Sequence, residues 1–113
     1  MSNKPATKPA DLTKKETALF IAVVVGMDEP GQGWLHELAD KAGLSGKELS
    51  GVVSSLIKKK MIYTEENCGE HYVEISKHGR SMRFAMSQAG ILVKRSGALF
   101  SSEGRYVKAP RTI

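Results

Sequence analysis

Cys68, His71 and His78 are the residues whose types and spacing first raise the question of metal or catalytic chemistry. Cys68-x-x-His71 matches the start of a metal-binding motif, and a thiol beside an imidazole can form a nucleophile pair. A structural zinc site needs four ligands, but the sequence has one cysteine and no convincing fourth partner. A nucleophile pair needs an orienting group and an oxyanion motif, and we identify neither. The sequence therefore predicts no metal site, no catalytic residue and no cofactor.

Gly31 and Gly33 form a Gly-x-Gly pair ahead of a predicted helix. The remaining glycine of a dinucleotide fingerprint is missing, as is the βαβ unit that would carry it. The pair therefore does not indicate a nucleotide site, and we predict that the protein is not an enzyme.

The length of 113 residues fits one domain with a single modest core. The longest apolar run, Ala18–Val25, is far shorter than the roughly 20 residues that a membrane-spanning helix needs. No apolar region follows the first charged residues, so we expect no secretory signal. A single cysteine fits a reducing compartment. These features predict a cytoplasmic protein with no membrane partner.

The net charge of +5 lies entirely in the two flanks of the chain. Residues 1–12 carry a net charge of +1, residues 13–90 hold ten basic and ten acidic side chains, and residues 91–113 carry +4. We predict a disordered N-terminal arm (1–12), a folded domain (13–90) and a basic C-terminal extension (91–113). A domain without net charge can still bind DNA if its charges gather on one face.

The first predicted helix runs from about Thr13 to Val25. Thr13-Lys14-Lys15-Glu16 has the capping-box pattern, in which the threonine oxygen and the glutamate carboxylate satisfy backbone amides at the helix start. From Ala18 onward the helix is apolar around most of its circumference, which predicts a place at the centre of the core. The β-branched run Val23–Val25 leaves a buried strand as the alternative, but the capping box favours a helix.

Two further helices are predicted on either side of a glycine-centred turn. The first spans Trp34 to Ala42, and the second spans about Gly46 to Lys60 with Ser45 as its N-cap. Gly43 suits the position after a helix, where φ is positive. Between the first helix and this pair, Asp28–Gly33 reads as a connector, with a short extended piece before the second helix.

After Met61 the hydrophobic period changes to that of strands. Ile62–Thr64 and Tyr72–Ile75 are predicted strands, and the polar segment Glu65–His71 is the predicted hairpin loop. Ser76 can cap a final helix of about Lys77 to Ala89. The apolar pieces beyond it fit a strand pair, a dimer contact or a docked tail: Ile91–Val93 and Leu99–Phe100.

Two helices around a glycine turn, followed by a hairpin, form the layout of a winged helix-turn-helix. Ala39 supplies the small residue where the helices cross, and Gly43 follows four positions later. The apolar positions that hold the helices together are Leu38, Ala42, Leu44, Leu49 and Val52. The predicted fold class is α+β, mainly α: a winged helix-turn-helix with a three-helix core, a β-hairpin wing and a further C-terminal helix.

The chain from about Leu12 to Ala89 resembles the winged-helix domains of MarR-type bacterial and phage transcriptional regulators. The resemblance is carried by Trp34-Leu35-His36-Glu37-Leu38-Ala39, Gly43-Leu44-Ser45, Leu56-Ile57-Lys58-Lys59-Lys60-Met61-Ile62 and Val73-Glu74-Ile75-Ser76-Lys77-His78-Gly79-Arg80. It implies a regulator that binds double-stranded DNA, with the second helix of the motif in the major groove and the wing beside the backbone. A homodimer that reads a two-fold-related site is also expected.

Opposite its apolar stripe, the groove helix presents small polar and basic side chains. Serine can hydrogen-bond phosphates or bases, and glycine allows a close approach. No Arg, Asn or Gln is available there for bidentate base contacts, so we expect modest sequence discrimination. The predicted DNA contacts are Ser45, Lys47, Ser50, Gly51, Ser54 and Lys58, with Lys59, Arg80 and Arg83 on phosphates. The alternative for this face is an ordinary solvated helix surface.

The predicted wing departs from the resembling family because it carries Glu65, Glu66 and Glu70 and no arginine. Carboxylates repel phosphates, so such a wing either points away from DNA or serves another contact. The alternative function is therefore a winged-helix protein-interaction module, in which the acidic wing or the apolar tail docks a protein partner.

Overall fold

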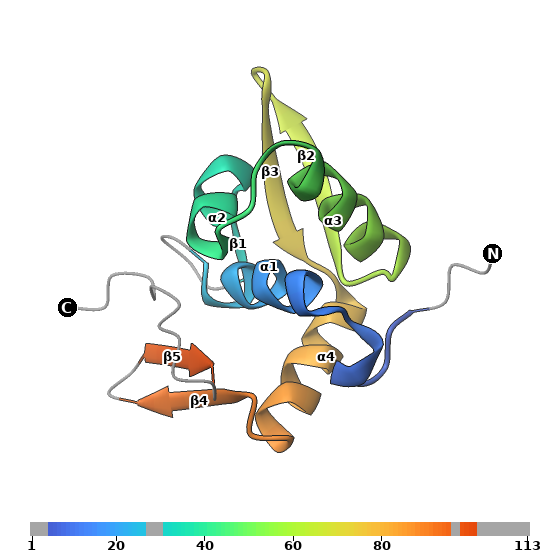
Figure 1. Cartoon of the computed structure of the whole chain (residues 1–113), viewed down its shortest axis with the longest axis vertical. Coiled ribbons are helices and arrows are strands. Elements are labelled where there is room, and N and C mark those ends of the chain that lie inside the picture. Colours follow the sequence, from blue (N-terminus) through green and yellow to red (C-terminus); the bar gives the residue numbers. More distant parts are fainter. Residues whose placement is uncertain (1–4, 27–30, 96–97, 102–113) are drawn as a thin grey trace.

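A computed structural model describes residues 5–26, 31–95 and 98–101. For Asn67 and for residues 92–95 and 98–101 it describes the backbone alone. Within these residues the chain forms a short 3₁₀ turn, four α-helices and five strands (Figure 1). The elements are η1 (Pro9–Asp11), α1 (Lys14–Val25), β1 (Gln32–Trp34), α2 (Leu35–Ala42), α3 (Gly46–Lys58), β2 (Ile62–Asn67), β3 (Glu70–Ile75), α4 (Lys77–Gln88), β4 (Leu92–Arg95) and β5 (Ala98–Ser101).

Helix α1 is the centre of the core, as the sequence predicts. Every side chain from Leu19 to Val25 is buried, so apolar neighbours surround the helix on all sides. The capping box is confirmed, because Thr13 Oγ1 accepts from the Glu16 amide at 3.2 Å and Glu16 Oε1 accepts from the Thr13 amide at 2.8 Å. The alternative of a buried strand over Val23–Val25 is excluded.

The turn between α2 and α3 has the predicted glycine geometry. Gly43 has φ 74° in the left-handed region, which a side chain disfavours. Leu38 and Ala39 are the buried residues of α2. Ser45 occupies the N-cap position of α3, but its side chain makes no cap hydrogen bond. The helix ends at Lys58, two residues before the predicted end.

The sheet is three-stranded and antiparallel, in the order β1-β3-β2. The predicted extended piece before α2 is β1, which pairs Gly33 with Val73. A mainly helical α+β fold is thus confirmed, and its arrangement is compatible with a winged helix. Residues 28–30 of the predicted connector lie outside the described residues.

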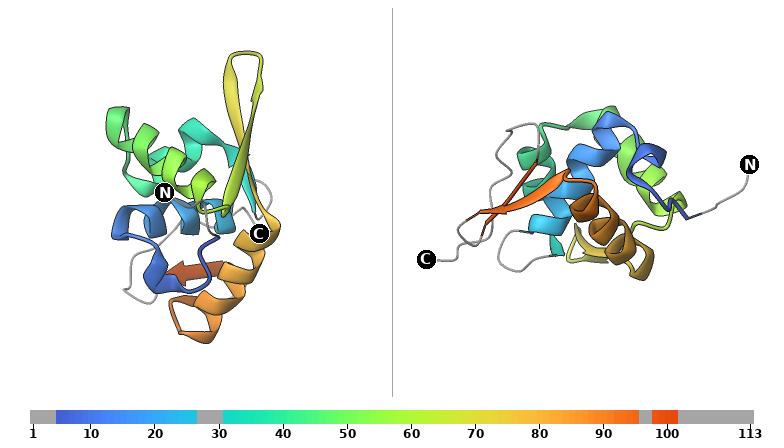
Figure 2. Two further views of the ribbon diagram at one scale, coloured as in Figure 1. Left: turned by 90° about the vertical axis from the view of Figure 1, so that its right-hand side faces the viewer. Right: turned by 90° about the horizontal axis from the view of Figure 1, so that it is seen from below.

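The prediction of a loop over Glu65–His71 is wrong. Strands β2 and β3 stay paired out to Asn67 and Glu70, and only Cys68 and Gly69 turn the chain, with φ 55° and 83°. Positive φ at both positions suits a two-residue hairpin turn. Figure 2 shows the hairpin rising beyond the helices. Its outer half therefore meets solvent on both faces and lacks the hydrophobic alternation that marks a strand.

Residues 5–12 of the predicted N-terminal arm pack against the helices. Ala6 and Leu12 are each only 7% exposed and join the core. The Ala6 amide donates to the Lys59 carbonyl at 3.0 Å, so the arm lies along the end of α3. Asp11 accepts hydrogen bonds from the Thr7 and Lys8 amides, which lower the pKa of its carboxyl. Residues 1–4 lie outside the described residues.

Helix α4 begins at the predicted cap, since Ser76 Oγ accepts from the Gly79 amide at 3.0 Å. Beyond it, β4 and β5 pair antiparallel, with Leu92 opposite Ser101. Among the alternatives for this region, the described backbone therefore forms a strand pair. No helix within the described residues is long and apolar enough to cross a bilayer.

Gly79 marks a close approach between α4 and the chain entering β2. A Cβ placed on Gly79 would lie 2.2 Å from the Met61 carbonyl oxygen and 2.6 Å from Ile75 Cγ1. We expect Gly79→Ala to lower the free energy of unfolding by about 3 kcal/mol, because backbone must move to admit the methyl group. Urea denaturation monitored by circular dichroism measures this change.

Gly51→Ala is the matched control for that variant. Gly51 also lies in a helix, but a Cβ there meets no atom within 4 Å. The control should raise the free energy of unfolding by roughly 0.5–1 kcal/mol, because alanine favours a helix interior. Equal effects of the two substitutions would contradict the close packing at Gly79.

Candidate nucleic-acid interface

The solvent face of α3 carries the stripe of side chains that the sequence predicts. Its members are Ser45, Lys47, Ser50, Gly51, Ser54 and Lys58, and all six are exposed. Val52 and Leu56 are buried on the other side of the helix. Glu48, the carboxylate of this helix, points toward α1, where it forms an ion pair with Lys15. The stripe itself therefore presents hydroxyls, glycine backbone and two ammonium groups.

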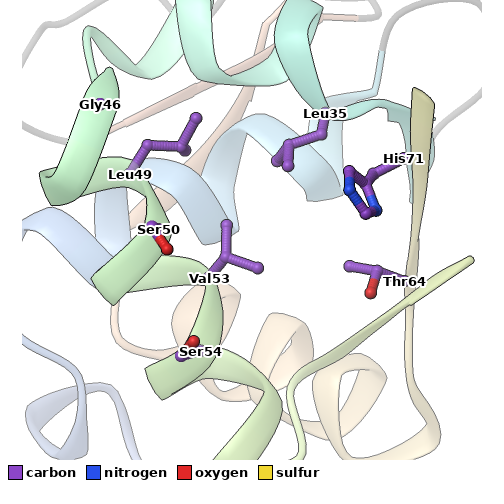
Figure 3. Close-up of a pocket in the computed structure, with 8 residues that line it drawn as sticks. All are labelled: Leu35, Gly46, Leu49, Ser50, Val53, Ser54, Thr64 and His71. Atoms are coloured by element: carbon purple, nitrogen blue, oxygen red, sulfur yellow. The ribbon is translucent and has the colours of Figure 1, made fainter. Parts of the chain in front are cut away.

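A hollow of about 250 Å³ lies between α3 and the hairpin (Figure 3). Leu35, Leu49 and Val53 give it an apolar lining. The polar lining consists of Ser50 and Ser54 from α3, with Thr64 and His71 from the two strands of the hairpin. The backbone of Gly46 completes it.

Thr64 and His71 are the members of this hollow that the sequence analysis missed as site residues. In the observed register, Thr64 lies opposite Val73, and His71 is two residues before Val73 on the same strand. Because alternate residues of a strand share a face, both side chains lie on the side of Val73, which faces the helices. The alternation of inward and outward side chains, continued along both strands from Val73, would have placed Thr64 and His71 on the inner face.

Lys59, one of the predicted phosphate contacts, is turned toward Glu16. Its ammonium lies 2.6 Å from Glu16 Oε1 and 2.8 Å from the Asp11 carbonyl oxygen, and the side chain is only 30% exposed. A buried carboxylate already neutralises this charge. Lys59 therefore links the end of α3 to Glu16 and Asp11, and its charge is already paired within the protein.

Arg80 and Arg83, the other two predicted phosphate contacts, lie on a different helix. They are exposed on α4, where they line a second hollow together with Val24, Gly31 and Ile75. Figures 1 and 2 show α4 on the opposite side of α1 from α3. The fold therefore does not bring the two arginines to the face that carries the α3 stripe.

Glu16 fixes α3 against α1. Glu16 is 4% exposed, and its carboxylate accepts hydrogen bonds from the Ser55 hydroxyl and the Lys59 ammonium of the α3 segment. Burial by itself raises the pKa of Glu16. The hydrogen bonds and the Lys59 charge outweigh that effect, so the pKa lies below its ordinary value. The orientation of the α3 stripe therefore depends on an ionised Glu16.

The two faces of the hairpin differ in charge. Tyr63, Glu65, Tyr72 and Glu74 alternate onto the outer face, away from the helices. The pKa of the Tyr63 phenol is raised, mainly because the negative charge of Glu74 disfavours the phenolate. On the inner face, the hydroxyl of Thr64 and the imidazole of His71 meet the hollow.

The residues once considered for metal or nucleophile chemistry occupy separate places. Cys68 is exposed at the hairpin turn, His71 lines the hollow, and His78 is exposed on α4. Among the described residues, no group of three or more His, Cys, Asp and Glu side chains could hold a metal ion.

Comparisons of the chain with protein-family models, curated proteins and solved structures found no match in any of the three. The functional argument therefore rests on the residues of this chain and their arrangement.

The Glu16 contacts predict how stability depends on pH. A carboxyl whose pKa is lower in the folded state stabilises the fold above its unfolded pKa, and this contribution is lost as pH falls through the folded pKa. We expect Glu16→Gln to lower the free energy of unfolding by about 2 kcal/mol at pH 7, with a smaller loss below pH 4. Urea denaturation at a series of pH values measures both effects.

Glu48→Gln is the control, because its ion pair with Lys15 is solvent-exposed. Its effect should stay within about 0.5 kcal/mol at every pH. If Glu16→Gln were as mild as this control, the carboxylate would not hold α3 in place.

Proposed function

We propose that the protein is a DNA-binding transcriptional regulator of the winged-helix, MarR-like kind, which inserts α3 into the major groove. The observation that carries this proposal is the exposed stripe on α3, free of carboxylates and adjoined by a projecting hairpin. A major groove about 12 Å wide admits a helix, and small side chains let its backbone approach the bases closely. A homodimer that binds a two-fold-related site belongs to this proposal.

The distribution of charge indicates how DNA would lie on the protein. Lys47 and Lys58 stand at the two ends of the stripe and are suited to phosphates on either side of the groove. Glu65, Glu70 and Glu74 on the outer face of the hairpin would repel phosphates, whereas the inner face carries a single glutamate, Glu66. The duplex would therefore contact α3 and the inner face of the hairpin. Serine hydroxyls make single contacts, so base discrimination would be modest.

Negative charge introduced on the stripe tests this proposal. We expect Ser50→Glu combined with Ser54→Glu to weaken binding of duplex DNA at least tenfold, because two carboxylates would face the groove. Fluorescence anisotropy of labelled duplex, titrated with the full chain, measures the affinity. Both serines are exposed, so the fold should be retained, which circular dichroism checks.

The matched control is Ser81→Glu combined with Ser87→Glu, which adds the same charge at two exposed positions of α4. It should weaken binding far less than the α3 variant does. Equal losses in the two variants would show that only net charge matters, and that α3 does not occupy the groove.

A protein-interaction module is the second candidate, and the outer face of the sheet favours it. Trp34 and Tyr72 contact each other edge to face, with ring centroids 5.1 Å apart, and Tyr63 is 51% exposed on the same face. Aromatic rings beside the carboxylates of Glu65 and Glu74 suit a partner that carries lysine or arginine. On this reading, any DNA binding would come from the basic C-terminal extension alone.

Removing three of the five basic charges of that extension separates the two candidates. Arg105, Lys108 and Arg111 would be replaced together by glutamine in the full chain. On the regulator proposal, the variant still binds duplex DNA with a log–log salt slope of several units, since each neutralised phosphate contributes about −0.9. Anisotropy titrations across a salt series measure this slope. Complete loss of binding would favour the protein-interaction module.

A further inference from the structure

His71 belongs neither to the exposed stripe on α3 nor to the buried residues of the sheet. It projects from β3 into the hollow, where it faces α3 across the gap (Figure 3). Ser50 and Ser54 line the hollow from the helix, and Thr64 lines it beside His71 from the adjacent strand. Four side chains that can hydrogen-bond thus converge on a lining that is otherwise aliphatic.

The lining indicates which part of a DNA molecule would fit. The hollow opens beside the α3 stripe, between the helix and the hairpin, where the backbone of one strand would leave the major groove. Hydroxyl and imidazole groups can donate to phosphate oxygens. Leu49 and Val53 offer an apolar surface against which a deoxyribose can pack. Neither lysine nor a carboxylate lines the hollow.

We propose that this hollow seats one sugar–phosphate strand of DNA, and that His71 is its pH-dependent phosphate ligand. The inference rests on the proposed function and adds a regulation to it. Histidine is the side chain that most readily takes up a proton near neutral pH, and a protonated imidazole would place a cation in the hollow. Protonated His71 then adds a charge-assisted hydrogen bond to one phosphate.

The charged groups around His71 come from the hairpin and from α2. Glu66 lies directly opposite His71 in the strand register. Glu70 precedes it and forms an ion pair with His36 of α2, with Nδ1 and Oε1 3.3 Å apart. Helix α3 contributes only neutral groups to this hollow. Carboxylates beside the hollow also repel a phosphate, so the test must isolate the contribution of the imidazole.

The experiment is an anisotropy titration of labelled duplex DNA with the full chain at pH 5.5 and pH 8, each across a salt series. We expect wild-type protein to bind roughly threefold to tenfold tighter at pH 5.5. Its log–log salt slope should be steeper there by about 0.9, the contribution of one more neutralised phosphate. His71→Gln should lose the additional slope and most of the gain in affinity.

Two further variants sharpen the result. His71→Lys places a permanent charge in the hollow, so it should bind at pH 8 about as tightly as wild-type protein binds at pH 5.5. His78→Gln removes an exposed histidine from α4 and should keep the wild-type pH dependence.

The outcomes distinguish this inference from the function on which it rests. If His71→Gln binds DNA with the same pH dependence and salt slopes as wild-type protein, the role of His71 is refuted and the regulator proposal stands. If wild-type protein binds no duplex at either pH, the regulator proposal fails, and the inference fails with it.

Discussion

A single buried carboxylate connects three segments of this chain that are far apart in the sequence. Glu16 closes the capping box that starts α1, and it accepts hydrogen bonds from Ser55 and Lys59 at the end of α3. Lys59 also binds the Asp11 carbonyl oxygen, and its own carbonyl accepts from the Ala6 amide. Breaking a buried, hydrogen-bonded pair by removing one partner leaves an uncompensated charge, which is strongly unfavourable. The position of α3, and with it the proposed DNA-binding face, depends on this cluster.

The same cluster decides which basic side chains remain for a ligand. Three consecutive lysines follow Ile57, and by charge alone any of them could meet a phosphate. Lys58 is exposed on the α3 stripe, whereas Lys59 turns inward to Glu16. Lys60 follows the helix with φ 64°, beyond the stripe. Adjacent residues of one helix thus have different roles, because successive helix positions point about 100° apart.

The hairpin explains how an acidic wing can coexist with a face suited to DNA. Its two faces alternate along the strands, so Glu65 and Glu74 lie on one side while Thr64 and His71 lie on the other. A count of charges along the sequence does not separate the two faces of the hairpin, so it predicts only that the hairpin repels DNA phosphates. Because the strands continue to Asn67 and Glu70, three glutamates lie on the outer face, and the inner face carries only Glu66 beside Thr64 and His71. The two surfaces can serve different ligands.

The sequence by itself determined the features that depend on near neighbours in the chain. The capping box at Thr13, the left-handed Gly43, the buried stripe of α3 and the cap at Ser76 each involve residues only a few positions apart, so their patterns can be read locally. Only the tertiary structure decided the inward turn of Lys59, the distance of Arg80 and Arg83 from α3, and the hollow that unites His71 with Ser54. Lys59 and Glu16 are 43 residues apart, and no local pattern encodes such a contact. Charge and hydropathy indicate which side chains can bind a ligand, but the packing of distant segments decides which of them face it together.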